Sequence, residues 1–398
     1  MKILQINSVV NSGSTGRIVE EIGNVLMEHG HESYIAYGRG EGKSRSNLIR
    51  IGKNMDVYYH VACTRFTDRH GFASKRATLN FLKEIDKIKP DLIALHNLHG
   101  YYINIEILFN YIKKLNIPVT WTFHDCWPFT GHCTHFENIN CYKWELTCYN
   151  CPKKLNYPKS FVDSSNYNYQ KKKYLFSQLK NLLIITPSFW LENYVRRSFF
   201  SNSSMTIHNG IDLKVFETTG KSYDFHSNKK SLIFVANVWT SSKGFNDLFS
   251  LRKILPDEYE MLVIGVSETQ RKQLPNGVKG IQRTKDQSEL AQYYAKAFCF
   301  VNPTYSDNFP TTNLEALACG TPVITYNTGG SPEAIDEKTG FVVEKGNVEG
   351  ILQAIQHLEN MNYEEVSKAC RARAEKLFDN NERFLEYLHV FENLVAHA

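Results

Sequence analysis

Two carboxylates eight residues apart, Asp307 and Glu315, are the side chains of this sequence best placed to do chemistry. The apolar run 297–303 before them predicts a buried strand, and Gly320 ends the helix that follows. Ligands of an open parallel sheet lie beyond the carboxyl ends of its strands, so we expect residues 304–315 in a binding crevice. Sugar hydroxyls suit such carboxylates, because hydroxyls donate well to charged acceptors. Helix capping by Asp307 and a surface ion pair of Glu315 explain the same spacing equally well.

A lysine stands at a similar place after another predicted strand, residues 231–236. Lys243 precedes a predicted helix, where its point charge can hold diphosphate oxygens and stabilise the charge that grows on a leaving group. A lone lysine before a helix is more often only solvated.

Glycines mark two further turns between a predicted strand and helix. The turn 11–17, with Gly13, Gly16 and Arg17, follows the first strand and exposes backbone N–H groups to a ligand. It matches neither G-x-G-x-x-G nor a P-loop, and any tight strand-to-helix turn would show the same residues. Gly330 precedes a second helix with a proline near its first position, which places Glu333 in the mouth of a crevice.

The segment from Asp307 to Pro322 resembles the Glu-x7-Glu motif of retaining glycosyltransferases of the GT-B fold in family 4, because it has two acids at that spacing and ends in Cys-Gly-Thr-Pro. The segment 209–212, Asn-Gly-Ile-Asp, resembles the family's passage between its two domains. The resemblance covers nearly the whole chain. It implies that Glu315 contacts the ribose of a nucleotide-sugar donor and that Asp307 lies beside the donor sugar.

The same resemblance implies the other donor contacts. Lys243 would hold the diphosphate, while Asn237 stands where the family has an arginine. Either Arg17 or helix amino ends then complete the neutralisation, or the donor is bound more weakly. Asp307 replaces the usual glutamate and has a shorter reach. The full set of expected donor-binding residues is Gly13, Gly16, Arg17, Asn237, Lys243, Thr284, Asn308, Phe309, Pro310, Thr311, Glu315, Gly330 and Glu333.

Three histidines follow predicted strands of the first half: His96 and His99 after one strand, His124 after the next. A histidine at such a place often only makes hydrogen bonds within its loop. The resemblance implies that His124 contacts a hydroxyl of the donor sugar and orients the transferred group. Asp125 could hold the His124 ring, and His96 and His99 are candidates for contact with the acceptor.

Four cysteines, Cys133, Cys141, Cys148 and Cys151, lie in a short segment without apolar periodicity. The C-x2-C spacing of the last pair is that of a zinc knuckle, so a structural zinc site is one hypothesis. Reduced, packed cysteines without an ion are the alternative, because the spacing of the first pair is not a standard zinc pattern. The segment resembles an insertion in a subgroup of bacterial family 4 enzymes, a resemblance that does not decide between the two.

Length and composition set further bounds. A chain of 398 residues predicts two domains, and a net charge of +5 indicates affinity for anionic ligands or surfaces and no nucleic-acid partner. The amino terminus is typical of a strand and no run is long enough for a membrane helix, so we expect a cytoplasmic protein. The basic, aromatic stretch 153–197 is either a solvated face or a surface that rests on anionic lipid heads at the inner face of the membrane.

Strands and helices alternate in two successive series, which predicts an α/β chain with two doubly wound sheets. The resemblance implies the GT-B arrangement, two Rossmann-like domains facing across a cleft. We expect an acceptor domain over 1–203, a donor domain over 204–379, and a last helix, 380–398, that packs back on the first domain. The polar stretch from Thr218 to Lys230 would follow the passage between them.

These observations indicate a retaining glycosyltransferase without a catalytic metal. It would move a sugar from a nucleotide diphosphate sugar to a saccharide or lipid-linked saccharide in bacterial surface polysaccharide biosynthesis. A nucleotide-sugar 2-epimerase of the same fold and a non-enzymatic, sugar-nucleotide-binding or zinc-dependent interaction protein are the alternatives. The sequence identifies neither the donor's base and sugar nor the acceptor and the linkage.

Overall fold

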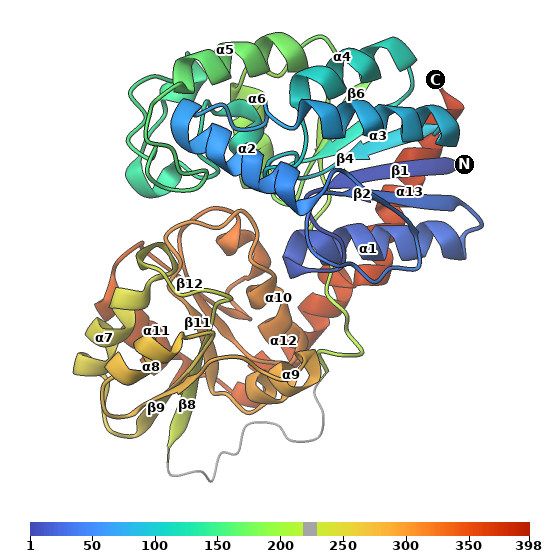
Figure 1. Cartoon of the computed structure of the whole chain (residues 1–398). Coiled ribbons are helices and arrows are strands. Elements are labelled where there is room, and N and C mark those ends of the chain that lie inside the picture. The colour runs from blue at the N-terminus through green and yellow to red at the C-terminus, as the bar shows by residue number, and fades with distance from the viewer. Residues whose placement is uncertain (218–228) are drawn as a thin grey trace. The chain divides into compact units, whose positions relative to one another are not determined.

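The computed structural model describes residues 1–217 and 229–398, and its chain divides into two compact units (Figure 1). Unit 1 comprises residues 1–207 and 384–398, and unit 2 comprises residues 208–383. Most of the polar stretch expected from Thr218 to Lys230 lies outside the described residues. Each unit has its own parallel sheet with helices around it, which confirms the prediction of two Rossmann-like α/β domains.

Within the described residues, the sheet of unit 1 has seven strands in the order β3-β2-β1-β4-β5-β6-β7, and every pairing is parallel. The order reverses beside β1, the topological switch point at which doubly wound sheets bind ligands. The strands are β1 (Lys2–Asn7), β2 (Glu32–Tyr37), β3 (Asn47–Arg50), β4 (Leu92–Leu95), β5 (Val119–Thr122), β6 (Leu182–Thr186) and β7 (Ser204–Thr206).

Helix α4 of unit 1 buries an apolar stripe in the core of that unit. In α4, Ile105, Leu108, Phe109 and Ile112 are buried at helical spacing, and the Asn104 side chain caps the helix by accepting from the Ile107 N–H at 3.0 Å. The helices are α1 (Gly13–Glu28), α2 (Asn54–Thr67), α3 (Lys75–Ile88), α4 (Ile105–Leu115), α5 (Ser165–Phe176) and α6 (Phe189–Arg197), with the short 3-10 turns η1 (Trp127–Phe129), η2 (Glu137–Ile139) and η3 (Lys143–Glu145).

Unit 2 repeats the design with six strands among its described residues, in the parallel order β10-β9-β8-β11-β12-β13. Its strands are β8 (Lys230–Val235), β9 (Tyr259–Ile264), β10 (Val278–Ile281), β11 (Cys299–Asn302), β12 (Val323–Tyr326) and β13 (Gly340–Val343). Its helical segments are η4 (Ser241–Lys243), α7 (Phe245–Ile254), α8 (Glu268–Gln273), α9 (Gln287–Ala295), α10 (Thr311–Ala318), η5 (Ser331–Ala334), α11 (Val348–Glu359) and α12 (Tyr363–Phe378).

The last helix, α13 (Asn380–Ala396), belongs to unit 1 from Phe384 onward. Its Phe384, Leu388 and Phe391 are buried in one cluster with Ile3 and Ile22 of β1 and α1. Apolar burial of this size holds the carboxyl end of the chain on unit 1.

Three stretches differ from the sequence expectation. The polar sequence that begins with Gly38-Arg39-Gly40 predicts a loop but contains β3 and α2, and the basic stretch 153–197 contains α5. The turn expected over 11–17 is shorter, because α1 already begins at Gly13. In α2 the buried residues are His60 and Thr64, so that helix shows no apolar period. In α5 the buried face interleaves Tyr169, Leu175 and Phe176 with Ser165, Asn168 and Lys172, which weakens its apolar period. No helix among residues 1–217 and 229–398 is both long and apolar enough to cross a membrane.

Candidate functional site

Three loops that follow the adjacent strands β8, β11 and β12 join at the carboxyl edge of the sheet in unit 2. The Tyr305 N–H donates to the Ser242 carbonyl at 2.9 Å, and the Thr328 hydroxyl donates to the Tyr305 carbonyl at 3.1 Å. The Gly330 N–H donates to the Asn308 carbonyl at 3.0 Å. These bonds hold the three loops as one surface at the place where parallel sheets bind ligands.

Two glycines make this junction possible. Gly329 has φ +55°, and a Cβ at that position would lie 1.5 Å from the Asp307 carbonyl oxygen. Gly244 has φ +78°, and its Cβ would lie 2.2 Å from the Pro303 carbonyl oxygen. Any side chain would force these backbones apart, so both positions require glycine.

Lys243 and Asp307, the cation and the first acid of the predicted site, form an ion pair across this junction. The Lys243 Nζ lies 2.6 Å from the Asp307 Oδ2, and both side chains are partly exposed. Lys243 ends the 3-10 turn η4, and Gly244 separates it from α7. The structure thus brings together two predicted residues that lie 64 positions apart, at a partly solvated place that an anion can reach.

Glu315, the second acid, is the fifth residue of α10. Its side chain is only 5% exposed, and the Tyr294 hydroxyl of α9 donates to its Oε2 at 3.2 Å. A buried carboxylate that accepts hydrogen bonds is oriented and poised to accept more. Tyr294 gives no sequence signal of this role, because it lies in a helix that the motif does not include.

The loop that carries Asn308, Phe309 and Pro310 rests on the first residues of unit 2. The His208 ring stacks on the Phe309 ring with centroids 4.7 Å apart, and the Asn209 side-chain amide donates to the Phe309 carbonyl at 3.2 Å. Pro310 is the N-cap of α10 and Thr311 its first residue. The segment 208–209 therefore supports the loop between the two acids.

The other expected donor residues lie along the same edge of unit 2. Asn237 is exposed just after β8, and Gly330 and Glu333 follow β12, where the Glu333 carbonyl accepts from the Arg373 guanidinium at 3.3 Å. Thr284 follows β10, which is separated from β8 by β9. The structure brings the loops after β8, β11 and β12 into direct contact. Of the expected donor-binding residues in unit 2, Thr284 follows the strand that lies farthest from these three in the sheet.

In unit 1 the expected residues follow the adjacent strands β1, β4 and β5. Gly13 is exposed with φ +64°, and Arg17 is exposed on α1. Gly16 is buried, and a Cβ there would meet the backbone N of Asn11 at 3.2 Å. Gly16 therefore allows α1 to pack closely against residues 9–11, which follow β1. Gly13 and Arg17 are exposed to solvent.

His124, after β5, is partly buried, and its Nε2 lies 3.1 Å from the Nδ1 of His96. The two rings stack with centroids 5.4 Å apart. Burial lowers the pKa of His124 to about 4 and that of His96 well below its usual value. Both imidazoles are thus neutral at physiological pH and share one hydrogen bond, so they can donate or accept but not act as cations.

Asp125 holds a different ring from the one expected. Its Oδ2 lies 2.6 Å from the Nε2 of His99, whose Nδ1 lies 3.0 Å from the Tyr157 hydroxyl. Its Oδ1 accepts the Trp127 N–H at 2.8 Å, and these contacts outweigh burial and lower the pKa of Asp125. Asp125 therefore orients His99, which makes His99 and Tyr157 the better-positioned pair. Tyr157 was not predicted, because it lies in the cysteine-rich segment, far from any strand end in sequence.

Cys133, Cys141, Cys148 and Cys151 line one small cavity together with His132 and Trp144. The Gly131 N–H donates to the Cys148 Sγ at 3.1 Å, and burial raises the pKa of Cys148 to about 12. Within residues 1–217 and 229–398, no three His, Cys, Asp or Glu side chains form a group that could hold a metal ion as they stand. The zinc hypothesis therefore stays a prediction.

Comparison with known proteins follows the same division of the chain. Residues 15–215 match the family described as Glycosyltransferase Family 4, and residues 229–360 match the family described as Glycosyl transferases group 1. A relative in Escherichia coli K12, the putative colanic acid biosynthesis glycosyl transferase WcaC, is 23% identical over 99% of this chain and 100% of its own length.

Two solved structures resemble the whole fold. The sucrose-phosphate synthase of Thermosynechococcus elongatus has a TM-score of 0.74 at 18% identity and covers 100% of both chains. HepE of Anabaena, solved in complex with UDP, has a TM-score of 0.70 at 13% identity over 99% of this chain and 100% of that one. At such identities the likeness establishes the fold alone.

Proposed function

The chain belongs to glycosyltransferase family 4 and is a glycosyltransferase, and from this premise we propose that it transfers a sugar from a nucleotide diphosphate sugar with retention of anomeric configuration. The acceptor is a saccharide or a lipid-linked saccharide, and the reaction serves bacterial surface polysaccharide synthesis. The colanic acid role printed for the Escherichia coli relative supports this setting. The UDP complex of HepE supports a nucleotide-sugar donor.

The observation that carries the proposal is the junction of three loops around Lys243, Asp307 and Glu315 in unit 2. When the bond between sugar and diphosphate breaks, negative charge grows on the diphosphate oxygens. A lysine fixed at that place stabilises the charge without moving. Glu315 is held as an acceptor for the ribose hydroxyls, and Asp307 keeps Lys243 in position and accepts from the donor sugar. We assign donor binding to unit 2 on these grounds.

We assign the acceptor to unit 1. Its polar groups at the ends of β4 and β5 are the neutral imidazoles of His96 and His124, the His99 ring and one buried carboxylate, which suit hydroxyl groups better than phosphates. His124 contributes a hydroxyl contact to the sugar that is transferred. His99, fixed between Asp125 and Tyr157, contributes one to the incoming acceptor. No step of this proposal uses a catalytic metal.

The test is a transfer assay with a panel of nucleotide sugars and saccharide acceptors. A thermal-shift screen against UDP, GDP and ADP sugars first identifies the donor, because a ligand of the native state raises the melting temperature. We expect release of nucleoside diphosphate only when an acceptor is present, and a product whose anomeric configuration by NMR equals that of the donor. Conversion of the donor to an epimer without acceptor, or no release with any acceptor, would contradict the proposal.

A further inference from the structure

The second helix of unit 1 turns its apolar side outward. The buried residues of α2 are polar: His60 bonds Ser74 through Nδ1 at 2.8 Å, and the Thr64 hydroxyl donates to the His60 carbonyl at 3.0 Å. Its exposed residues include Met55, Tyr58, Tyr59 and Phe66, which are between 64% and 75% exposed. These four positions follow helical spacing and so form one stripe. A stripe of this kind on the outside of a helix marks an interaction surface.

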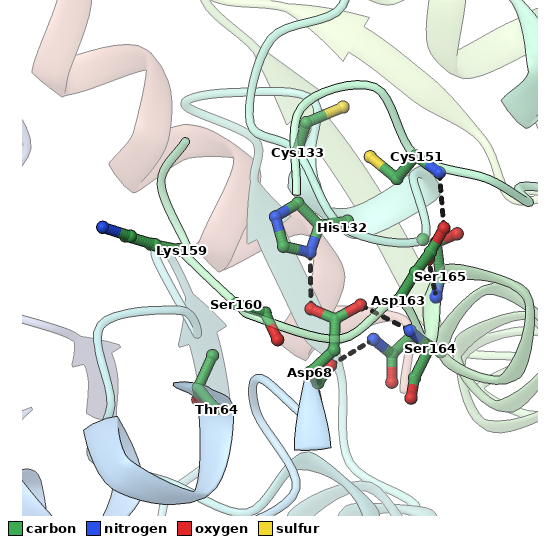
Figure 2. A network of polar contacts seen from close by, with 12 residues as sticks. Thr64, Asp68, His132, Cys133, Cys151, Lys159, Ser160, Asp163, Ser164 and Ser165 are labelled. Atoms are coloured by element: carbon green, nitrogen blue, oxygen red, sulfur yellow. Dashed lines mark hydrogen bonds and ion pairs between the residues drawn. The ribbon is translucent and has the colours of Figure 1, made fainter. Parts of the chain in front are cut away.

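A segment of the cysteine-rich insertion extends this stripe. The Phe161 N–H donates to the Arg65 carbonyl at 2.8 Å, and the Ser164 N–H donates to the Asp68 Oδ2 at 2.8 Å, which fixes residues 160–164 to the end of α2. Figure 2 shows Asp68 at the centre of this network, bonded also to the Nδ1 of His132 at 2.5 Å. The side chains of Asp68 and His132 are both fully buried. A shift of the insertion relative to α2 would break their contact and leave the buried Asp68 carboxylate without this partner, which is costly.

Together the two elements form one apolar patch. The Phe161 ring lies 5.8 Å from the Phe66 ring, and Phe161 and the neighbouring Val162 are exposed. We call this surface the α2 patch; its members are Met55, Tyr58, Tyr59, Phe66, Phe161 and Val162.

Cations surround the α2 patch. Lys53, Arg69 and Lys159 are exposed, and Arg65 is partly exposed where it donates to the Lys159 carbonyl. The nearby acids are engaged with backbone groups: Asp56 accepts the Lys53 N–H at 2.7 Å, and Asp163 accepts the N–H groups of Cys151 and Ser165. These bonds orient the two carboxylates but leave their charge in place. The four cations outnumber the two acids, so the surroundings of the patch carry a net positive charge that is complementary to an anionic surface.

We infer that the α2 patch docks the enzyme on a bilayer surface that contains anionic lipids. Tyrosine and phenylalanine favour the boundary between headgroups and acyl chains, and lysine and arginine bind the anionic headgroups above it. The inference rests on the proposed function, in that a lipid-linked acceptor would be presented at such a surface. Within the basic stretch 153–197, it narrows the expected membrane contact to residues 159–164, and it adds α2 to that contact.

A second copy of the chain is a poorer occupant. A symmetric dimer would place the same patch on both sides of the interface. The cations Arg65, Arg69 and Lys159 would then face their own copies, which is unfavourable between like charges. An anionic bilayer meets both the apolar and the charged parts of the surface.

The test is sedimentation of the full chain with vesicles of phosphatidylcholine alone or mixed with phosphatidylglycerol. We expect binding to the mixed vesicles that weakens as salt is raised, because headgroup attraction is screened. Little binding is expected to phosphatidylcholine alone. Equal binding to both vesicle types, or to neither, would overturn the inference. The sedimentation assay needs no sugar nucleotide. A negative result in the transfer assay with a soluble acceptor therefore does not change the result of the sedimentation assay, and the two proposals can fail separately.

Variants separate the α2 patch from other exposed aromatic residues. The triple change Tyr58→Ser, Tyr59→Ser and Phe66→Ser should weaken binding to mixed vesicles more than tenfold, and Lys159→Gln should weaken it about fivefold, the factor that one lysine near an anionic surface supplies. The matched control is Tyr174→Ser, which removes an equally exposed aromatic ring from α5 and should leave binding unchanged.

Circular dichroism and the thermal shift with the donor show whether each variant is folded, and Phe161→Ser alone is the milder substitute should the triple variant unfold. Folded patch variants that bind as the wild type does would overturn the inference. The inference would also be overturned if light scattering shows a dimer and the same substitutions abolish it, because the patch would then be a self-association surface.

Discussion

The Nζ of Lys243 lies 2.6 Å from the Oδ2 of Asp307 where the loops after β8 and β11 meet. The pair is partly solvated, so its own contribution to folding is small. Its consequence for binding is larger, because the carboxylate and the diphosphate of a donor both seek the same ammonium group. In our proposal Asp307 is therefore both the support of Lys243 and a competitor of the leaving group.

This competition predicts opposite effects for the two partners. Asp307→Asn should bind free nucleoside diphosphate several-fold more tightly and transfer sugar at least tenfold more slowly, because the repulsion is removed together with a sugar contact. Lys243→Met should weaken nucleoside diphosphate binding at least tenfold. Isothermal titration with the nucleoside diphosphate of the identified donor measures both. Weaker binding by the Asp307 variant would show that the carboxylate supports the lysine and does not compete.

Glu315 and Tyr294 give a second prediction. Glu315→Gln keeps the size of the side chain but removes the charged acceptor, so donor affinity should fall about tenfold or more, as expected for hydrogen bonds to a charged group. Tyr294→Phe removes only the bond to Oε2 and should weaken donor binding less, mainly by loosening the carboxylate. Binding is measured with the intact sugar nucleotide. Equal losses in both variants would assign the effect to packing instead of to the charge.

The sequence predicted the regular framework closely. Apolar patterning predicts helices over 105–115, 348–359 and 363–378 and strands over 182–186, 323–326 and 340–343. These are the bounds of α4, α11, α12, β6, β12 and β13 in the structure. The patterning missed α2 because the inward face of that helix is polar, and a helix that hides His60 and Thr64 shows no apolar period on that face. The helix could have been suspected only from Met55, Tyr58, Tyr59 and Phe66, whose spacing is helical but whose side chains are exposed.

The sequence predicted which residues of the candidate site lie near strand ends, but it did not predict which of their side chains contact one another. Each of Lys243, Asp307 and Glu315 follows a strand or starts a helix, which is a local signal. The contact between Lys243 and Asp307 depends on the order of β8 and β11 in the sheet, and the pairing of Asp125 with His99 depends on that of β4 and β5. Tertiary pairings of this kind are not encoded in spacing along the chain.

Buried histidines predict an acid-sensitive unit 1. Burial lowers the pKa of His60 to about 3 and of His124 to about 4, and it lowers the pKa of His70 and His96 well below the usual value. In the unfolded chain these rings take up protons near pH 6.5. Below that pH the unfolded state binds more protons than the native state, so stability is full above about pH 6.5 and falls as the pH is lowered toward 4.

Urea unfolding followed by tryptophan fluorescence measures this effect, because Trp121, Trp127, Trp144 and Trp190 lie in unit 1 and only Trp239 in unit 2. We expect the midpoint to fall between pH 7 and pH 5. In His124→Gln the amide can still bond His96, but one titrating ring is lost. The slope of the free energy of unfolding against pH should therefore decrease by the contribution of one histidine, which is at most roughly 1.4 kcal/mol per pH unit. A midpoint that is constant or rises on acidification would contradict the burial of these rings.

The four cysteines of the insertion give the last prediction. Cys133, Cys141, Cys148 and Cys151 line one cavity, so the zinc hypothesis requires their thiolates to turn toward its centre. We expect purified protein to contain about one zinc per chain, held tightly enough to survive dialysis, as four-thiolate sites do. Cys148→Ser should release the zinc and lower the melting temperature, whereas Cys319→Ser, a buried cysteine of unit 2, should leave the zinc content unchanged. Less than about half an equivalent of zinc in the wild type, with all four thiols reactive toward a maleimide after unfolding, would instead establish reduced, packed cysteines.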